Sequence, residues 1–249
     1  MEKLDSLEEY KWIRDETVYF LTDERKGSRV KNFLPKRFDH YCKIIHPLFR
    51  DPQVEDEQLL WRDCTPEQTD DIQLGERLRL FGLVEKYGLK FSKELSAASF
   101  MNKLGGSPRY IISGEEGEIE PESLKRLVHV LQPFTEEASC YFYFDLLKTK
   151  DYVNALYHGK LAEVEELATS DDLRLTPTYW WPADKSWCLY SDIDLSFSLI
   201  GGSRELIDAL LADDFLECIE CDATTRIDNL ADYTNNESPP RGRNNSKGF

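Results

Sequence analysis

The segment from Thr178 to Cys221 constrains the fold more than any other part of the chain. Between Trp187 and Ile200, apolar residues occupy one side of an alternating pattern and polar residues occupy the other. Such alternation is typical of an antiparallel strand with one buried face and one solvated face. The segment therefore predicts, in order, a strand, a turn, a long strand, a second turn, a helix and a returning strand, over residues 178–181, 182–185, 187–200, 201–202, 203–211 and 216–221.

The helix in this segment has a clear start signal. Ser203 is a favourable N-cap residue, and it follows Gly201 and Gly202, which predict a tight turn. A glycine pair ahead of a helix N-terminus is also found in anion sites, but the lysine and the spacing of a phosphate-binding loop are missing. We therefore interpret this segment as a turn followed by a capped helix.

Other segments predict a mixture of strands and helices. Leucines and valines spaced three and four residues apart after Pro121 predict an amphipathic helix that ends at Pro133. The aromatic run from Cys140 to Leu147 predicts a strand buried on both faces. Strand pairs mixed with helices favour an α+β fold, with a mixed, mainly antiparallel sheet and helices packed on it. Further strands are expected at 17–21, 38–45 and 110–112, and further helices at 78–87 and 161–168.

The chain is expected to form one domain with a tail. Its 249 residues, 41% of them hydrophobic, are enough for a sizeable core. We expect a single α+β domain over residues 1–233. Within it, the polar and acidic stretch 51–73 is expected to be a surface excursion anchored by Trp61. Residues 234–249 have almost no apolar side chains and are expected to be a disordered tail.

The charge of the chain limits its partners. The 47 acidic and 31 basic side chains give a formal net charge of −16. Because affinity for nucleic acid and for anionic lipid depends on basic side chains, we expect no nucleic-acid binding and no membrane association. No apolar run is long enough to span a bilayer, and no signal peptide is visible. The six cysteines are therefore expected to be reduced thiols in a cytoplasmic protein.

Motifs that carry chemistry are few. Cys218 and Cys221 have the spacing of a redox motif, but they follow a helix and fall in an expected strand, with their side chains on opposite faces. His40, Cys42 and His46 fall on even positions, and the first two share a strand face, but nothing in the sequence places them with Cys218 or Cys221 to complete a set of four zinc ligands. The motifs of serine hydrolases and of zinc proteases are missing. We expect no metal and no cofactor.

Two features supply the candidate binding residues. Asp192 and Asp194 share a face of the predicted strand, where two carboxylates suit a divalent cation, acid–base chemistry or simple solvation. The hairpin before them carries five aromatic side chains, more than one buried face accommodates, so part of it is expected at a groove or partner surface. The alternative is a cross-strand aromatic ladder over the core. The candidate binding residues are Tyr179, Trp180, Trp181, Trp187, Tyr190, Asp192 and Asp194.

Three segments together resemble a family of uncharacterised bacterial proteins. Residues 30–50 contain a Leu-Pro pair, a tyrosine and a His-Pro pair, and residues 131–144 contain an aromatic strand. Residues 177–217 contain a Trp-Trp-Pro turn, a Trp-Cys strand and a Gly-Gly-Ser helix start. The resemblance covers most of the chain. It implies a bacterial cytoplasmic origin and a single integrated domain, and it assigns no catalytic residues.

Two functions from different classes fit these observations. The first is a non-catalytic acidic module that binds a basic protein partner, of the immunity or antitoxin type, because acidic surfaces speed and select such binding. The alternative is an enzyme, or a protein that binds a small ligand or a cation with Asp192, Asp194 and the aromatic hairpin. A pocket with converging carboxylates favours the alternative, whereas a flat acidic patch with exposed tryptophans favours the first.

Overall fold

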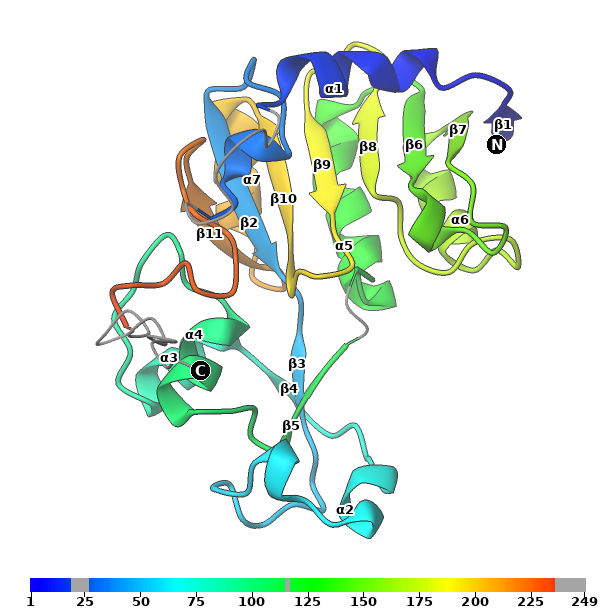
Figure 1. The fold of residues 1–249 in the computed structure, drawn as a ribbon. Helices are drawn as coiled ribbons and strands as arrows, with labels where there is room; N and C mark the ends of the chain where they lie inside the picture. Colours follow the sequence, from blue (N-terminus) through cyan, green and yellow to red (C-terminus); the bar gives the residue numbers. More distant parts are fainter. Residues whose placement is uncertain (19–26, 115–116, 236–249) are drawn as a thin grey trace, which may run out of the picture.

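Two β-sheets form the frame of the protein (Figure 1). The computed structural model describes residues 1–18, 27–114 and 117–235. Within these ranges the large sheet has eight strands, each antiparallel to its neighbours, in the order β1-β7-β6-β8-β9-β10-β2-β11. The strands are β1 (Glu2–Leu4), β2 (His40–Ile45), β6 (Cys140–Phe144), β7 (Ala155–Gly159), β8 (Tyr179–Pro182), β9 (Cys188–Ser191), β10 (Phe197–Gly202) and β11 (Glu217–Cys221).

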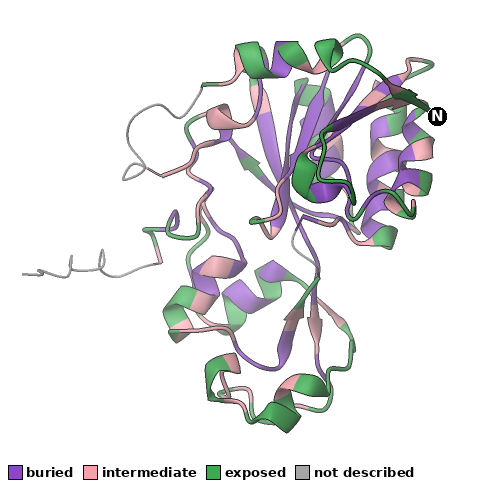
Figure 2. Ribbon diagram, turned by 45° about the vertical axis from the view of Figure 1, so that its right-hand side comes forward, coloured by how far each residue is buried: buried purple, intermediate pink, exposed green. Residues whose placement is uncertain are grey.

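Both faces of the large sheet are covered, and its strands are buried almost throughout in Figure 2. Three helices pack on one face, where their leucines contact Trp180 and Ile200. The first helix and the segment 30–38 lie over the other face, where Trp12 packs edge-on against Trp181 with 6.1 Å between ring centroids. Because of this double cover, the strands lack the solvated face that their alternating sequence predicts. The helical elements are η1 (Glu8–Tyr10), α1 (Lys11–Glu16), η3 (Val30–Asn32), α5 (Pro121–Leu131), η5 (Gln132–Phe134), η6 (Leu146–Lys148), η7 (Leu161–Glu163), α6 (Val164–Ala168) and α7 (Arg204–Leu211).

A three-stranded sheet projects from one end of the large sheet (Figure 1). Strand β3 follows β2 after only His46 and Pro47, and it pairs with two strands in the order β4-β3-β5. We call residues 48–114 the small-sheet region. It contains β3 (Leu48–Arg50), η4 (Trp61–Asp63), α2 (Pro66–Asp70), β4 (Arg77–Leu78), α3 (Leu80–Lys86), α4 (Ala97–Leu104) and β5 (Ile111–Ser113).

The stretch 51–73, predicted as a surface excursion, is fastened to the small-sheet region by a buried ion pair. Arg109 Nη1 donates to Asp51 Oδ2 at 2.6 Å, and both side chains are almost fully buried. The same guanidinium donates to two backbone carbonyls of the stretch, at 2.7 Å each. Trp61, the expected anchor, lies against this guanidinium, with 4.5 Å from Cζ to the ring centroid. The stretch 51–73 therefore folds around the guanidinium of Arg109.

Polar contacts tie the small-sheet region to the large sheet. The carboxylate of Glu217 in β11 accepts hydrogen bonds from the N–H groups of Leu80 at 2.7 Å and Phe81 at 2.8 Å, at the start of α3. Lys43 in β2 donates to the carbonyl of Leu95 at 2.6 Å. Helix N-terminal N–H groups have no partner within the helix, so the buried carboxylate stabilises this end of α3. These contacts fix the two sheets relative to each other.

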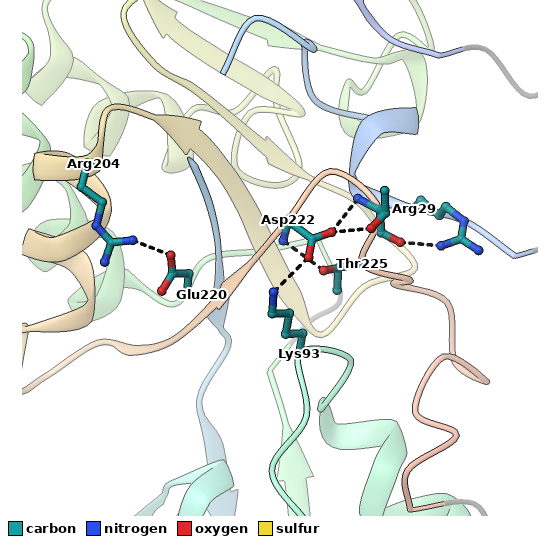
Figure 3. A network of polar contacts seen from close by, with 7 residues as sticks. Arg29, Lys93, Arg204, Glu220, Asp222 and Thr225 are labelled. Carbon is teal, nitrogen blue, oxygen red and sulfur yellow. Dashed lines mark hydrogen bonds and ion pairs between the residues drawn. The ribbon is translucent and has the colours of Figure 1, made fainter. Parts of the chain in front are cut away.

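Charged side chains flank β11, which is an edge strand of the large sheet (Figure 3). Arg204 of α7 pairs with Glu220 of β11 at 2.6 Å. At the end of the strand, Asp222 accepts hydrogen bonds from Lys93 Nζ at 3.0 Å and from the N–H of Thr224 at 2.8 Å. The hydrogen bonds from the Thr224 hydroxyl and from Lys93 hold the pKa of Asp222 well below its usual range. Charges at an edge oppose pairing with the strand of another chain.

The long strand predicted over 187–200 is two strands. Strand β9 ends at Ser191 and β10 begins at Phe197. Between them the chain turns, because Asp192 Oδ1 accepts the N–H of Asp194 at 2.9 Å. A side-chain oxygen that bonds the backbone two residues later favours a turn over a continuous strand.

The predicted turn at Gly201 and Gly202 is also wrong, because both residues lie inside β10. A Cβ atom at Gly201 would lie 2.7 Å from the ring of Phe38, so this position requires glycine for close packing. The predicted N-cap is confirmed: Ser203 Oγ accepts the N–H of Leu206 at 3.3 Å, and α7 begins at the next residue.

The predicted fold class is confirmed, since the sheets are antiparallel and helices pack on the large one. In the strand predicted at 17–21, Thr17 and Val18 are not in a strand, and residues 19–21 lie outside the described residues. Residues 236–249 of the predicted tail also lie outside them, whereas Asn235 bonds to both backbone groups of Lys90. None of the helices in the described ranges is long and apolar enough to cross a membrane.

Candidate functional site

The aromatic hairpin does not face solvent. Trp180 and Trp187 pack edge-on, with 5.9 Å between centroids, on the face under α5. Tyr179 and Tyr190 pack on the opposite face at 4.7 Å. The expectation that part of the hairpin is exposed at a partner surface is wrong, because both faces of the sheet are covered and a cross-strand ladder forms instead. None of the five aromatic candidates is more than 7% exposed: Tyr179, Trp180, Trp181, Trp187 and Tyr190.

The two candidate carboxylates lie in the turn between β9 and β10, and not on a strand face as predicted. Asp192 is half-buried, and its Oδ2 accepts a hydrogen bond from the hydroxyl of Tyr190. Asp194 is exposed, and its carboxylate contacts no donor in the described part of the chain. Neither residue is in an ion pair within that part. The carboxylate of Asp192 interacts only at longer range with the charge of buried Lys148.

The described residues show no cluster of metal ligands and no disulfide. No three His, Cys, Asp or Glu side chains gather there as metal ligands, and the absence of a metal stays a prediction. All six cysteines are free, and Cys218 and Cys221 lie in β11 as expected. A hydrogen bond with Cys218, followed by burial, raises the pKa of Cys42, and burial raises the pKa of Cys221 to about 12. Protonated thiols are poor nucleophiles.

A cleft of about 450 Å³ opens where the small-sheet region meets the end of the large sheet. This volume is within the range of about 300–1,000 Å³ that is typical of sites for small organic ligands. Helix α4 forms one wall, and the ends of β2 and β10 form the other. The polar lining residues are His46, Asn102, Ser107, Ser113, Asp194, Ser196 and Asn229, and the apolar ones include Pro47, Leu48, Ala97, Ala98 and Met101.

His46 is a nearly buried polar group in the wall of this cleft. It follows β2 directly, and its backbone N–H donates to the backbone carbonyl of Ser196 at 3.1 Å. Its ring Nε2 is 2.9 Å from Ser198 Oγ, which is 2.6 Å from Ser191 Oγ. Burial, and then the positive charge of Lys148, lower the pKa of His46 to about 3. The imidazole is therefore neutral at physiological pH.

The second ring nitrogen of His46 is the group that the fold leaves open to a ligand. Nδ1 has no hydrogen-bond partner in the described part of the chain, and His46 lines the cleft. Hydroxyl groups rotate, so the chain from Ser191 through Ser198 to Nε2 can run in either direction. The neutral ring can therefore present either a donor or an acceptor at Nδ1.

Helix α4 positions the opposite wall. The helix begins after Ser96 and ends at Gly105, whose left-handed φ of 73° suits a glycine C-cap. Its small side chains Ala97 and Ala98 leave room for the cleft. Asn102 Nδ2 donates to the carbonyl of Asn229 at 2.9 Å, which holds the C-terminal part of the described chain against the helix.

A second cavity of about 180 Å³ adjoins the cleft. Asp194 and Asn229 line both cavities, and Asp192 lines the smaller one. The two predicted carboxylates therefore meet at one cavity, although they are not the strand pair that the sequence indicates. The remaining lining residues are Ser28, Phe33, Leu195, Ile227 and Asp228.

Sequence reasoning identifies Asp194 and misses most of the cleft. The sequence marks His46 as the end of a strand and as one of the zinc-ligand candidates, and neither Asn102 nor Ser196 belongs to a motif. One signal for His46 is present, since it forms the His-Pro pair in the family resemblance. The other residues come from separate segments, and only the fold brings them together.

A family model matches residues 26–229, which is most of the chain. The chain belongs to the DUF2711 family. The description of DUF2711 is a protein of unknown function, and this confirms the resemblance to an uncharacterised family. All residues that line the two cavities lie within the DUF2711 match. No curated protein and no solved structure matches the chain.

Proposed function

We propose that this protein is a non-catalytic binding protein for a small polar ligand, which occupies the cleft between α4 and the ends of β2 and β10. The convergence of polar groups on a cavity of about 450 Å³ carries the proposal. His46, Asp194 and Asn102 approach this cavity from three segments that are far apart in the sequence. Apolar side chains such as Met101 line the remainder, which is the usual composition of a small-ligand site.

The chemistry of the lining favours binding over catalysis. General acid–base catalysis works best when the pKa of the side chain is close to the working pH, and the pKa of His46 is about 3. Ser198, whose hydroxyl is hydrogen-bonded to the imidazole of His46, is fully buried and cannot reach a substrate. A neutral imidazole and a free carboxylate at Asp194 are suited to hold a ligand by hydrogen bonds.

The test is a titration of the labelled protein with a set of polar fragments, followed by the backbone amide signals in NMR spectra. We expect shifts at Ala98, Asn102 and Ser196. Ala98→Phe places a ring inside the cleft and should abolish these shifts. Ala162→Phe is the matched control, because Ala162 is exposed on η7, away from the cleft, and this variant should bind as the wild type does.

Two results would contradict the proposal. In the first, no fragment shifts the amide signals around the cleft. In the second, Ala98→Phe binds the fragments as the wild type does while its melting temperature remains unchanged. Either result would mean that the cleft is an unoccupied gap between the two sheets.

A second candidate is the acidic module that binds a basic protein, of the immunity or antitoxin type, in the cytoplasm of a bacterium. The net charge of −16 supports it. The aromatic hairpin does not support this candidate, because its rings are buried and cannot contact a partner. The test is co-elution with the product of a neighbouring gene. A complex that forms at low salt and dissociates at high salt would favour this candidate.

A further inference from the structure

The two adjoining cavities are acidic. Among the described residues, no lysine or arginine lines either of them. Asp228 in the smaller cavity is paired with Arg226 at 2.5 Å. Asp192 and Asp194 are in no ion pair within the described part of the chain. Buried Lys148 offsets part of the charge of Asp192 at longer range, but with a net charge of −16 on the chain the potential at this turn still attracts a cation.

An independent feature indicates that the cleft holds an organic molecule. His46 is only 8% exposed, it lines the cleft, and its Nδ1 has no partner among the described residues. A buried polar group normally has a hydrogen-bond partner, so an open position of this kind is suited to a ligand atom. Leu48 and Met101 add apolar contact surface beside it.

We infer that the ligand is a small organic cation, with an ammonium group beside Asp192 and Asp194 and an uncharged, hydroxyl- or carbonyl-bearing body in the larger cleft. This inference rests on the proposed function of the cleft. An ammonium group has three donors and no acceptor, and it therefore matches carboxylates that have no basic partner. The body of the ligand then reaches His46 Nδ1 and the hydroxyl of Ser196.

The same geometry is less suited to a bare divalent cation. Calcium takes about six to eight oxygen ligands, and magnesium requires an octahedral set. Both carboxylate oxygens of Asp192 already accept hydrogen bonds, from the N–H of Asp194 and from the hydroxyl of Tyr190. No third acidic side chain joins them as a ligand group among the described residues. An ammonium group needs only one free carboxylate and open space beside it.

The experiment compares three probes by calorimetry and amide NMR: 4-amino-1-butanol, its uncharged isostere 1,4-butanediol, and magnesium chloride. We expect the amino alcohol to bind at the cleft about tenfold more tightly than the diol, and more weakly at high salt. Asp194→Asn should weaken binding of the amino alcohol by about tenfold and leave diol binding unchanged. Asp171→Asn, on an exposed loop after α6, is the matched control and should change neither.

The outcomes separate this inference from the proposed function. Equal binding of diol and amino alcohol at the cleft overturns the cation inference and leaves the proposed function intact. Displacement of the amino alcohol by magnesium, with loss of magnesium binding in Asp194→Asn, overturns it in favour of a metal. If none of the three probes shifts a cleft signal while neutral fragments do, the inference also fails. If no fragment of any charge binds, both proposals fail.

Discussion

At the scale of single residues, buried charge is the feature that distinguishes this protein. Lys148 is fully buried, and its Nζ donates to the carbonyls of Gly117, Thr176 and Ser191 at 3.0 Å each. Burial lowers the pKa of Lys148 to about 8. Its hydrogen bonds join two loops to the end of β9, and its charge contributes to the neutral state of the His46 ring.

The neutral ring of His46 leads to a prediction about acid stability. The pKa of His46 is about 3 in the folded protein, against an ordinary value of 6.5. As the pH falls below 6.5, the unfolded chain therefore binds a proton that the folded chain does not. The stability from neutral His46 is fully present above pH 6.5 and is lost as the pH falls toward 3. Between pH 7.5 and 5, the wild type should lose about 2 kcal/mol more than His46→Asn.

The measurement is urea unfolding of both proteins at several pH values. Subtraction of the two curves removes the contribution of the carboxylates that both share. His129→Asn, at an exposed position of α5, is the control and should follow the wild type. Parallel curves for the wild type and His46→Asn would show that the ring is not buried as described.

The side chains of β10 and of the turn before it should respond very differently to substitution. Phe197 is 3% exposed and lies in the core opposite Ile45 of β2. Phe197→Ala should cost about 3–5 kcal/mol, the usual range for deletion of a buried ring. Asp194→Asn should change stability by no more than about 0.5 kcal/mol, because that side chain is exposed and has no partner among the described residues. Urea unfolding measures both, and a mild effect of Phe197→Ala would mean that the register of the strand is wrong.

At the scale of elements, the small-sheet region depends on a single buried cation. Arg109 neutralises Asp51 and holds two carbonyls of the stretch 51–73. Arg109→Met should cost about 3–5 kcal/mol, because it leaves Asp51 as an uncompensated charge in the interior. Arg62→Met is the control, since the ion pair between Arg62 and Asp63 is exposed and should contribute no more than about 1 kcal/mol.

Hydrogen exchange shows which part of the molecule is destabilised by Arg109→Met. In Arg109→Met, the amides of α2 and β5 should lose protection while those of β10 keep theirs. A uniform loss over both sheets would instead mean that the small-sheet region does not unfold separately. Full retention of stability would show that the ion pair is unimportant.

At the scale of the whole molecule, the double cover of the large sheet determines which parts are available for function. Both faces are packed against helices and loops, so among the described residues the strands present little open surface. The cleft lies at the end of the sheet, where the small-sheet region meets β2 and β10. The contacts of Glu217 and Lys43 fix this junction, so the cleft is formed without a ligand.

The end of the chain supports a prediction about truncation. Removal of residues 236–249 should change the melting temperature by less than about 2 °C, because this segment has almost no apolar side chains to bury. Removal of Asn235 as well should lower it by a few degrees, roughly the effect of 1 kcal/mol, since Asn235 bonds both backbone groups of Lys90. Thermal unfolding of the two truncated proteins decides this, and a large fall for the shorter deletion would contradict it.

The sequence by itself determined the local elements. The cap at Ser203 and the helix α7 follow from interactions between residues a few positions apart, and both form as predicted. The strand β11 also forms as its local pattern predicts, although its hydrogen-bond partner is the distant strand β2. The tertiary structure alone decided the surroundings of these elements. The cover on the second face of the sheet buried the aromatic hairpin, although alternation had indicated a solvated side. The cleft assembled His46, Asn102 and Asp194 from distant segments, because a cavity depends on the packing of whole elements and has no local pattern.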